Sequence, residues 1–152
     1  MRPVTCLLAA LTAAAACKPP PDPSGRTVAD VHGERALEVI RKATAVDLGL
    51  IEKSRKRRVT TWVRVDPWTA SALARIFLTP ESYDFADPTL CGPTPRVAVR
   101  FLHEKEEALV KLCFQCNVAL GEVGWGDLDP VRDRLAEIVR QHLPRDAHVP
   151  GL

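Results

Sequence analysis

Apolar and polar positions alternate with a period of two in the first half of the chain, and this pattern predicts a hairpin. Residues 44–51 (TAVDLGLI) place a valine and two leucines on one side and Asp47 on the other, and residues 59–65 (VTTWVRV) alternate in the same way. Such alternation is typical of strands with one buried face. The polar segment EKSRKRR, residues 52–58, lies between them and is predicted to form the tip of an antiparallel hairpin.

Three segments show the spacing of amphipathic helices instead. The first is ERALEVIRK, residues 34–42. The second begins at Asp66-Pro67, an N-cap residue followed by proline at the first helical position, and ends before Pro80. The third follows the same signal at Asp129-Pro130. Their predicted buried positions are Leu37, Val39, Ile40 and Ala43; then Trp68, Ala72, Leu73, Ile76 and Phe77; then Val131, Leu135, Ile138, Val139 and Leu143.

The second half of the chain repeats the strand pattern. Residues 96–102 and 109–116 are predicted to be strands joined by a turn over residues 102–108, and NVALGEV, residues 117–123, is a candidate third strand. The glycines of GWGD, residues 124–127, indicate a turn. Strands in hairpin order with flanking helices predict a small α+β domain, built on an antiparallel sheet of about five strands.

The N-terminus carries a targeting signal. Arg2 precedes an uncharged apolar run that ends in small residues directly before Cys17. A charged start, a short apolar core and small residues at the cleavage site describe a secretory signal. The sequence AAAC is similar to the lipobox of bacterial lipoproteins, although Ala14 stands where leucine is preferred. Lipidation of Cys17 would anchor the chain in a membrane; the alternative is an ordinary secreted protein cleaved nearby.

Lys18 follows the cysteine where aspartate would signal retention in the inner membrane, so the lipoprotein rule implies the outer membrane of the cell envelope. The expected organisation is a signal peptide over residues 1–16, a lipidated cysteine and proline-rich tether over 17–26, the α+β domain over 27–145 and a C-terminal tail over 146–152. Without Arg2, 20 basic residues face 19 acidic ones. This balance argues against nucleic acid as a partner.

Three cysteines remain after Cys6 leaves with the signal and Cys17 is lipidated, and an odd number in an oxidising compartment needs an explanation. One interpretation is a disulfide from Cys91 to Cys113 or Cys116, with the last thiol buried. Another is a zinc or copper site with all three thiolates and His103 as the candidate fourth ligand. A thioredoxin-like redox pair and simple buried cysteines complete the alternatives.

Strand geometry bears on the metal interpretation. Residues three apart in a regular strand point to opposite faces, so Cys113 and Cys116 converge only if a turn or bulge begins near Phe114. The redox interpretation is weaker because the pair follows a strand rather than starting a helix, where the dipole would lower a thiol pKa.

The strongest local concentration of charge is basic and lies at the predicted hairpin tip. One interpretation is contact with anionic lipid headgroups or a phosphate-bearing polymer. The other is a solvated turn that discourages edge-to-edge aggregation. The residues concerned are Lys53, Arg55, Lys56, Arg57 and Arg58.

No catalytic motif is visible in the sequence. HEKEE lacks the second histidine of a zinc protease, GxSxG is missing, and none of the four histidines stands beside an obvious nucleophile. The aromatic residues Trp62, Trp68, Tyr83 and Phe85 suit either a ligand-stacking patch or, as we expect, the core. The sequence therefore favours binding or a structural role over catalysis.

The order of these motifs resembles a family of uncharacterised bacterial lipoproteins and secreted proteins. The resemblance covers roughly residues 66 to 143, and "CFxC" with an upstream cysteine is its most specific part. It implies that the three cysteines act as one constellation, and it brings no known activity. This chain departs from the pattern in having GPTP after Cys91. The shared positions are Ser82, Tyr83, Cys91, Pro95, Arg100, Phe101, Cys113, Phe114 and Cys116.

Overall fold

Six antiparallel strands form one open sheet in the computed structural model, which describes residues 24–53, 58–86, 91–144 and 148–152. The α+β prediction is confirmed, with one strand more than expected. The strand order across the sheet is β2-β1-β3-β4-β5-β6. The strands are β1 (Ala45–Ile51), β2 (Val59–Arg64), β3 (Val97–His103), β4 (Glu106–Cys113), β5 (Val118–Leu120) and β6 (Trp125–Asp127).

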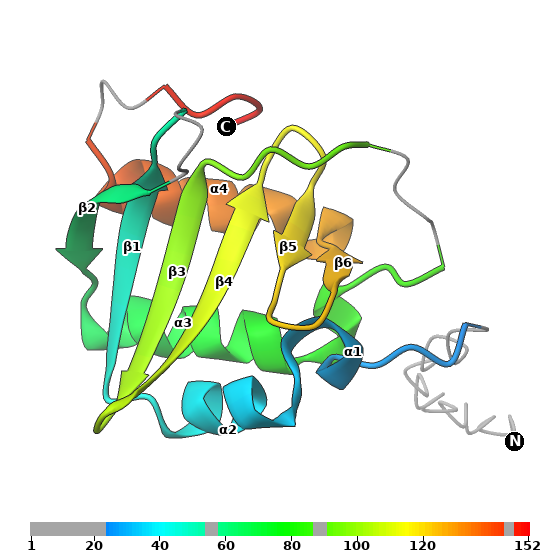
Figure 1. The fold of residues 1–152 in the computed structure, drawn as a ribbon. Coiled ribbons are helices and arrows are strands. Elements are labelled where there is room, and N and C mark those ends of the chain that lie inside the picture. Colours follow the sequence, from blue (N-terminus) through cyan, green and yellow to red (C-terminus); the bar gives the residue numbers. More distant parts are fainter. Residues whose placement is uncertain (1–23, 54–57, 87–90, 145–147) are drawn as a thin grey trace, which may run out of the picture.

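The helices gather on one face of this sheet (Figure 1). In the described part of the chain they are α1 (Ala29–His32), α2 (Glu34–Lys42), α3 (Pro67–Leu78) and α4 (Arg132–His142), with short 3-10 turns η1 (Pro80–Ser82) and η2 (Asp129–Val131). The main core lies between helices and sheet. It takes alternate residues of the strands, such as Val46 and Leu48, and the apolar stripes of the helices. Because side chains alternate along a strand, the intervening residues of each strand lie on the opposite face of the sheet.

Helix α3 begins as the sequence predicts. The Asp66 carboxylate accepts hydrogen bonds from the backbone N–H groups of Trp68 and Thr69, and Pro67 occupies the first turn. One member of its predicted buried stripe is wrong, since Trp68 is 88% exposed. It lies in the first turn of the helix, outside the packed segment of Leu73, Ile76 and Phe77.

Three other local predictions are corrected. The turn predicted over residues 102–108 is much shorter, because β4 already begins at Glu106. The segment GWGD was predicted to be a turn, but Trp125–Asp127 pair with β5 as strand β6. Asp129 opens η2 rather than capping α4, which begins at Arg132 without a side-chain cap.

A buried polar pair fixes α1 to the rest of the domain, and the sequence analysis did not single it out. His32 Nε2 and the Tyr83 hydroxyl share a hydrogen bond of 2.6 Å, and both side chains are almost completely buried. Burial lowers the pKa of His32 to about 4 and raises the pKa of Tyr83 far above its usual value. Both groups are therefore neutral near pH 7.

Both ends of the described chain contact the domain. Arg26, placed in the predicted tether, donates a hydrogen bond to the Trp125 carbonyl and lies over the rings of Phe85 and Trp125. In the predicted C-terminal tail, Val149 is buried and Arg132 donates to the Gly151 carbonyl at 2.6 Å. The signal peptide and Cys17 lie outside the described residues. Within those residues, no helix has the length and apolar character to cross a membrane.

Candidate functional site

The three cysteines of the predicted constellation lie close to the hairpin that joins β4 to β5. Strand β4 ends at Cys113, a turn occupies residues 114–117, and Cys113 pairs with Val118 of β5. Cys116 forms a disulfide with Cys91, with a Cα–Cα distance of 5.8 Å, while Cys113 is a free, buried thiol. This is the arrangement of the first interpretation, a disulfide from Cys91 with the last thiol buried.

The turn does bring Cys113 and Cys116 together, as part of a small apolar cluster. Cys113, Cys116 and Val118 form its buried part, and Leu120 and Trp125 pack against them. With two of the three sulfurs joined to each other, only Cys113 remains as a thiol. The residues therefore do not fit a three-thiolate zinc or copper site, and the described part of the chain holds no cluster of three metal-ligating side chains.

His103, the candidate fourth ligand, lies far from this cluster. It pairs with Glu106 at the opposite end of β4 from Cys113. Cys113 follows Glu106 by seven positions along the strand, which corresponds to about 24 Å. The structure does not bring His103 to the cysteines.

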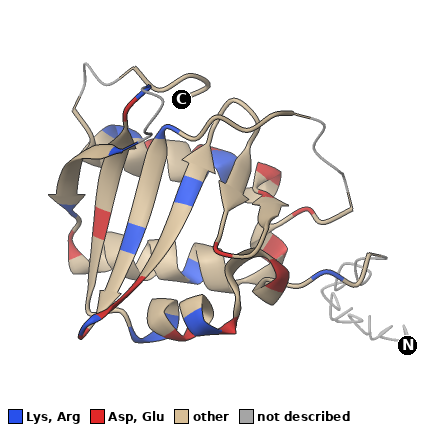
Figure 2. Ribbon diagram, in the orientation of Figure 1, with Lys and Arg blue, Asp and Glu red and all other residues tan. Residues whose placement is uncertain are grey.

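The face of the sheet opposite the helices, hereafter the open face, carries the clearest concentration of charge and aromatic surface. Residues directly opposite one another on neighbouring strands share a face. One row across the open face contains Arg64, Asp47, Arg100 and Leu109. The next row contains Trp62, Gly49, Ala98, Lys111, Leu120 and Trp125. Figure 2 shows the acidic position on β1 and the basic positions on β3 and β4.

Asp47 is the centre of this arrangement. Its carboxylate is nearly inaccessible and lies between two guanidinium groups: Arg64 donates to Oδ1 and Arg100 donates to Oδ2 at 2.8 Å. Burial alone would raise the pKa of Asp47, but hydrogen bonds and charge from Arg64 and Arg100 outweigh it and lower that pKa. The aspartate is therefore ionised near pH 7 and fixes both arginines on the surface of the sheet.

Trp62 contacts this ion pair through Arg100. The Arg100 guanidinium is 4.1 Å from the centroid of the Trp62 ring, a cation–π contact. The ring fits because its cross-strand neighbour is Gly49. A Cβ at that position would lie 2.7 Å from the indole. Of the four aromatic residues expected in the core, Tyr83 and Phe85 are there. The expectation is wrong for Trp62, which is half-buried on the open face, and for Trp68, which is exposed.

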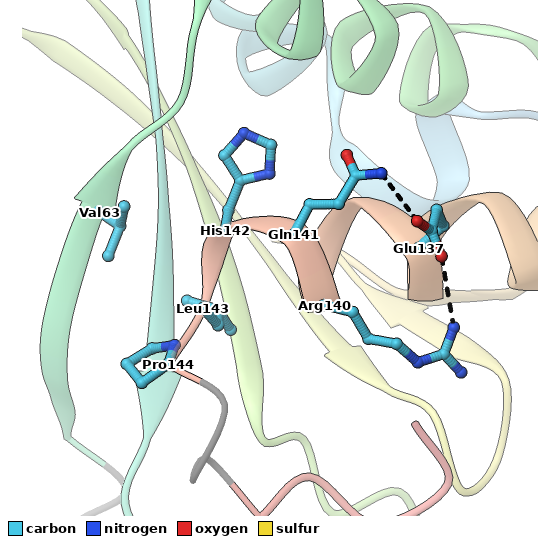
Figure 3. Close-up of a pocket in the computed structure, with 7 residues that line it drawn as sticks. All are labelled: Val63, Glu137, Arg140, Gln141, His142, Leu143 and Pro144. Carbon is cyan, nitrogen blue, oxygen red and sulfur yellow. Dashed lines mark hydrogen bonds and ion pairs between the residues drawn. The ribbon is translucent and has the colours of Figure 1, made fainter.

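A pocket of about 720 Å³ lies between the end of α4 and the side of β2 that faces away from the open face (Figure 3). Val63, Leu143 and Pro144 form its apolar part, and Glu137, Arg140, Gln141 and His142 supply polar groups. His142 Nδ1 lies 2.9 Å from the Ile138 carbonyl, and Nε2 lies 3.4 Å from Asp66. Glu137 accepts a hydrogen bond from Gln141.

The predicted basic run lies at the hairpin that joins β1 and β2. Lys53 and Arg58 are exposed at its two ends. Arg55, Lys56 and Arg57 lie outside the described residues.

The sequence pattern pointed to the cysteines and did not by itself identify Asp47 and Arg100 as a pair. The sequence nevertheless contains a pattern from which this pair could have been predicted. Two otherwise apolar strands, AVDLGLI and VAVRFLH, each contain a single residue of opposite charge near the middle. Such residues are costly to bury unless they are paired, so each is a candidate partner for the other.

Comparisons with known proteins do not indicate a function for this site. No family model, no curated protein and no solved structure matches the chain.

Proposed function

We propose that this chain is a lipid-anchored protein of the bacterial envelope, placed on the outer membrane, that binds an acidic partner protein with the open face of its sheet. The observation that carries the proposal is that Arg64, Arg100 and Lys111 share the open face with Trp62, over which Arg100 lies. Asp47 is the carboxylate between the two arginines, which already neutralise it in part. The register also places Glu107 and Asp127 on the open face. Arginine and tryptophan are also the side chains most enriched at energetically important contacts between proteins.

The rigidity of the face supports binding further. Asp47 holds both guanidinium groups and Trp62 stacks under one of them, so little side-chain entropy remains to be lost when a partner binds. The exposed Arg64 guanidinium and Lys111 ammonium would attract an acidic surface and accelerate its approach. A three-cysteine metal protein remains the alternative from the sequence, and it requires the Cys91–Cys116 disulfide to be reduced.

The membrane anchor is tested by Cys17→Ser in the full chain. We expect this variant to lose incorporated radiolabelled palmitate and to leave the membrane fraction, because it lacks the thiol that receives the lipid. Cys6→Ser is the matched control and should keep the label. The unchanged protein should fractionate with outer-membrane markers. Equal labelling of the Cys17→Ser variant would exclude lipidation at this residue.

Binding by the open face is tested with a photoreactive amino acid at position 109 in living cells, because Leu109 lies on this face opposite Arg100 and carries no charge. We expect one or a few discrete cross-linked adducts, which Arg100→Gln should weaken at least tenfold by removing a central cation. The same photoreactive residue at position 41, on the exposed side of α2, is the control and should give no such adduct. The thermal midpoint of each variant checks that it is folded. Identical adducts from both positions, or none from position 109, would contradict the proposal.

A further inference from the structure

Strand β2 is a free edge of the sheet. The strand order ends at β2 on one side and at β6 on the other, and β6 is partly covered because Asp84 N–H donates to the Asp127 carbonyl at 3.0 Å. Within the described residues no strand or bridge lies beyond β2. An unpaired edge is a template for a further strand.

The unused backbone groups of β2 can be assigned from its register. Val65 N–H donates to the Val46 carbonyl, and hydrogen-bonded pairs alternate along an antiparallel ladder. Val63 and Thr61 therefore also bond to β1, whereas the N–H and C=O groups of Trp62 and Arg64 point away from it. The sequence VTTWVR contains no proline, and its β-branched and aromatic residues suit strand pairing. One irregularity, between Leu50 and Ile51 of the partner strand, affects only the Val59 end.

The two sides of this edge offer different environments. Trp62 and Arg64 lie on the open face, while Val63 lines the pocket against Leu143 and His142 of the α4 end (Figure 3). An added strand would place alternate side chains beside Trp62 and Arg64 and the intervening ones in the pocket. In recognition by strand addition, backbone hydrogen bonds provide affinity and pockets for alternate side chains provide specificity.

The charges along the edge indicate which segment would bind. Arg64 is well exposed, Lys53 and Arg58 are exposed at the far end of the strand, and Arg140 lies at the pocket. The nearby carboxylates already have partners. Asp47 binds two arginines, Glu137 contacts Gln141 and Arg140, and Asp66 caps α3. These contacts favour acidic side chains in the added strand.

We propose that β2 binds an extended acidic segment of a partner protein by strand addition, with alternate side chains entering the pocket between β2 and α4. This inference rests on the proposed binding function and specifies how the partner is held. A second copy of the chain is a poorer occupant, because pairing two β2 strands would bring two sets of the same cations to one edge.

The test uses the full chain in detergent and a fluorescein-labelled ten-residue peptide with glutamate at alternate positions and threonine or valine between. We expect saturable binding by fluorescence anisotropy, which a peptide with lysine in place of glutamate should lack. N-methylation of alternate backbone amides removes the donors of one edge of the peptide. One of the two alternating N-methylated peptides should bind at least tenfold more weakly, and the other should bind like the parent.

Two matched arginines provide the protein control. Arg140 and Arg41 are both about half-exposed on helices, and each forms an ion pair with a glutamate three residues before it. Arg140→Glu should weaken binding of the acidic peptide at least tenfold, and Arg41→Glu should not change it. Gln141→Trp, which fills the pocket from an exposed position, should also abolish binding.

Three results would overturn this inference. The first is no binding at millimolar peptide, and the second is equal binding by both N-methylated peptides. The third is a concentration-dependent dimer, in sedimentation experiments, that Gln141→Trp abolishes, since this would assign the edge to a second copy. The cross-linking experiment at position 109 tests the proposed function independently. Adducts there without peptide binding would preserve the function and exclude strand addition.

Discussion

Cys91→Ser should lower the free energy of unfolding by about 3.5 kcal/mol. The disulfide from Cys91 to Cys116 closes a loop between residues 25 positions apart, and restricting an unfolded loop of that length stabilises the folded state by about this amount in the chain-entropy model. Urea unfolding of the oxidised proteins measures the difference. For a domain of this size such a loss should lower the thermal midpoint by roughly 10 °C.

Cys113→Ala is the control for this experiment. It removes the buried free thiol, leaves the disulfide intact and should cost only about 1 kcal/mol, from the lost packing of one sulfur. Alkylation of the denatured, unreduced protein followed by peptide mass spectrometry should label Cys113 and find Cys91 linked to Cys116. If a chelator-free preparation instead shows three alkylatable thiols and a metal that both variants lose, the metal alternative is correct and the disulfide is wrong.

Acidification from pH 6.5 to pH 4 should cost about 3 kcal/mol of stability through His32 alone. Burial lowers the folded-state pKa of His32 from the ordinary 6.5 to about 4, so the unfolded chain binds a proton throughout this interval that the folded chain does not. The contribution of the neutral His32 ring to the free energy of unfolding is complete above pH 6.5. It decreases as the pH falls and does not change further below about pH 4. Each unit of pKa difference corresponds to about 1.4 kcal/mol.

The loss of stability caused by His32 occurs at a higher pH than the loss caused by the carboxylates. Asp47, Asp66 and Asp30 all have a lowered pKa, so protonation at these sites destabilises the fold below their ordinary pKa of 3.8. Urea unfolding at half-unit steps of pH measures the profile. His32→Phe should flatten it between pH 6.5 and 4. An unchanged slope in His32→Phe would show that His32 is not the group responsible.

The Asp47–Arg100 pair shows why a contact between residues far apart in the chain is not predicted by a local sequence pattern. Asp47 and Arg100 are 53 residues apart, and neither residue is informative by itself. Only the register that pairs β1 with β3 places them opposite each other. The choice of Cys116 over Cys113 as the partner of Cys91 likewise depends on where β4 ends and the turn begins, which periodicity defines only within a few residues. Trp68 fits a helical stripe, yet it is exposed.

The sequence alone determined the α+β class and the positions of α2, α3 and the β1–β2 hairpin. Period and capping are properties of neighbouring residues, so a linear pattern records them. The tertiary structure decided the strand order, strand β6, the buried His32–Tyr83 pair, the paired cysteines and the free edge at β2. Each of these depends on contacts between residues far apart in the chain, whose energies come from packing and burial and leave no local period in the sequence.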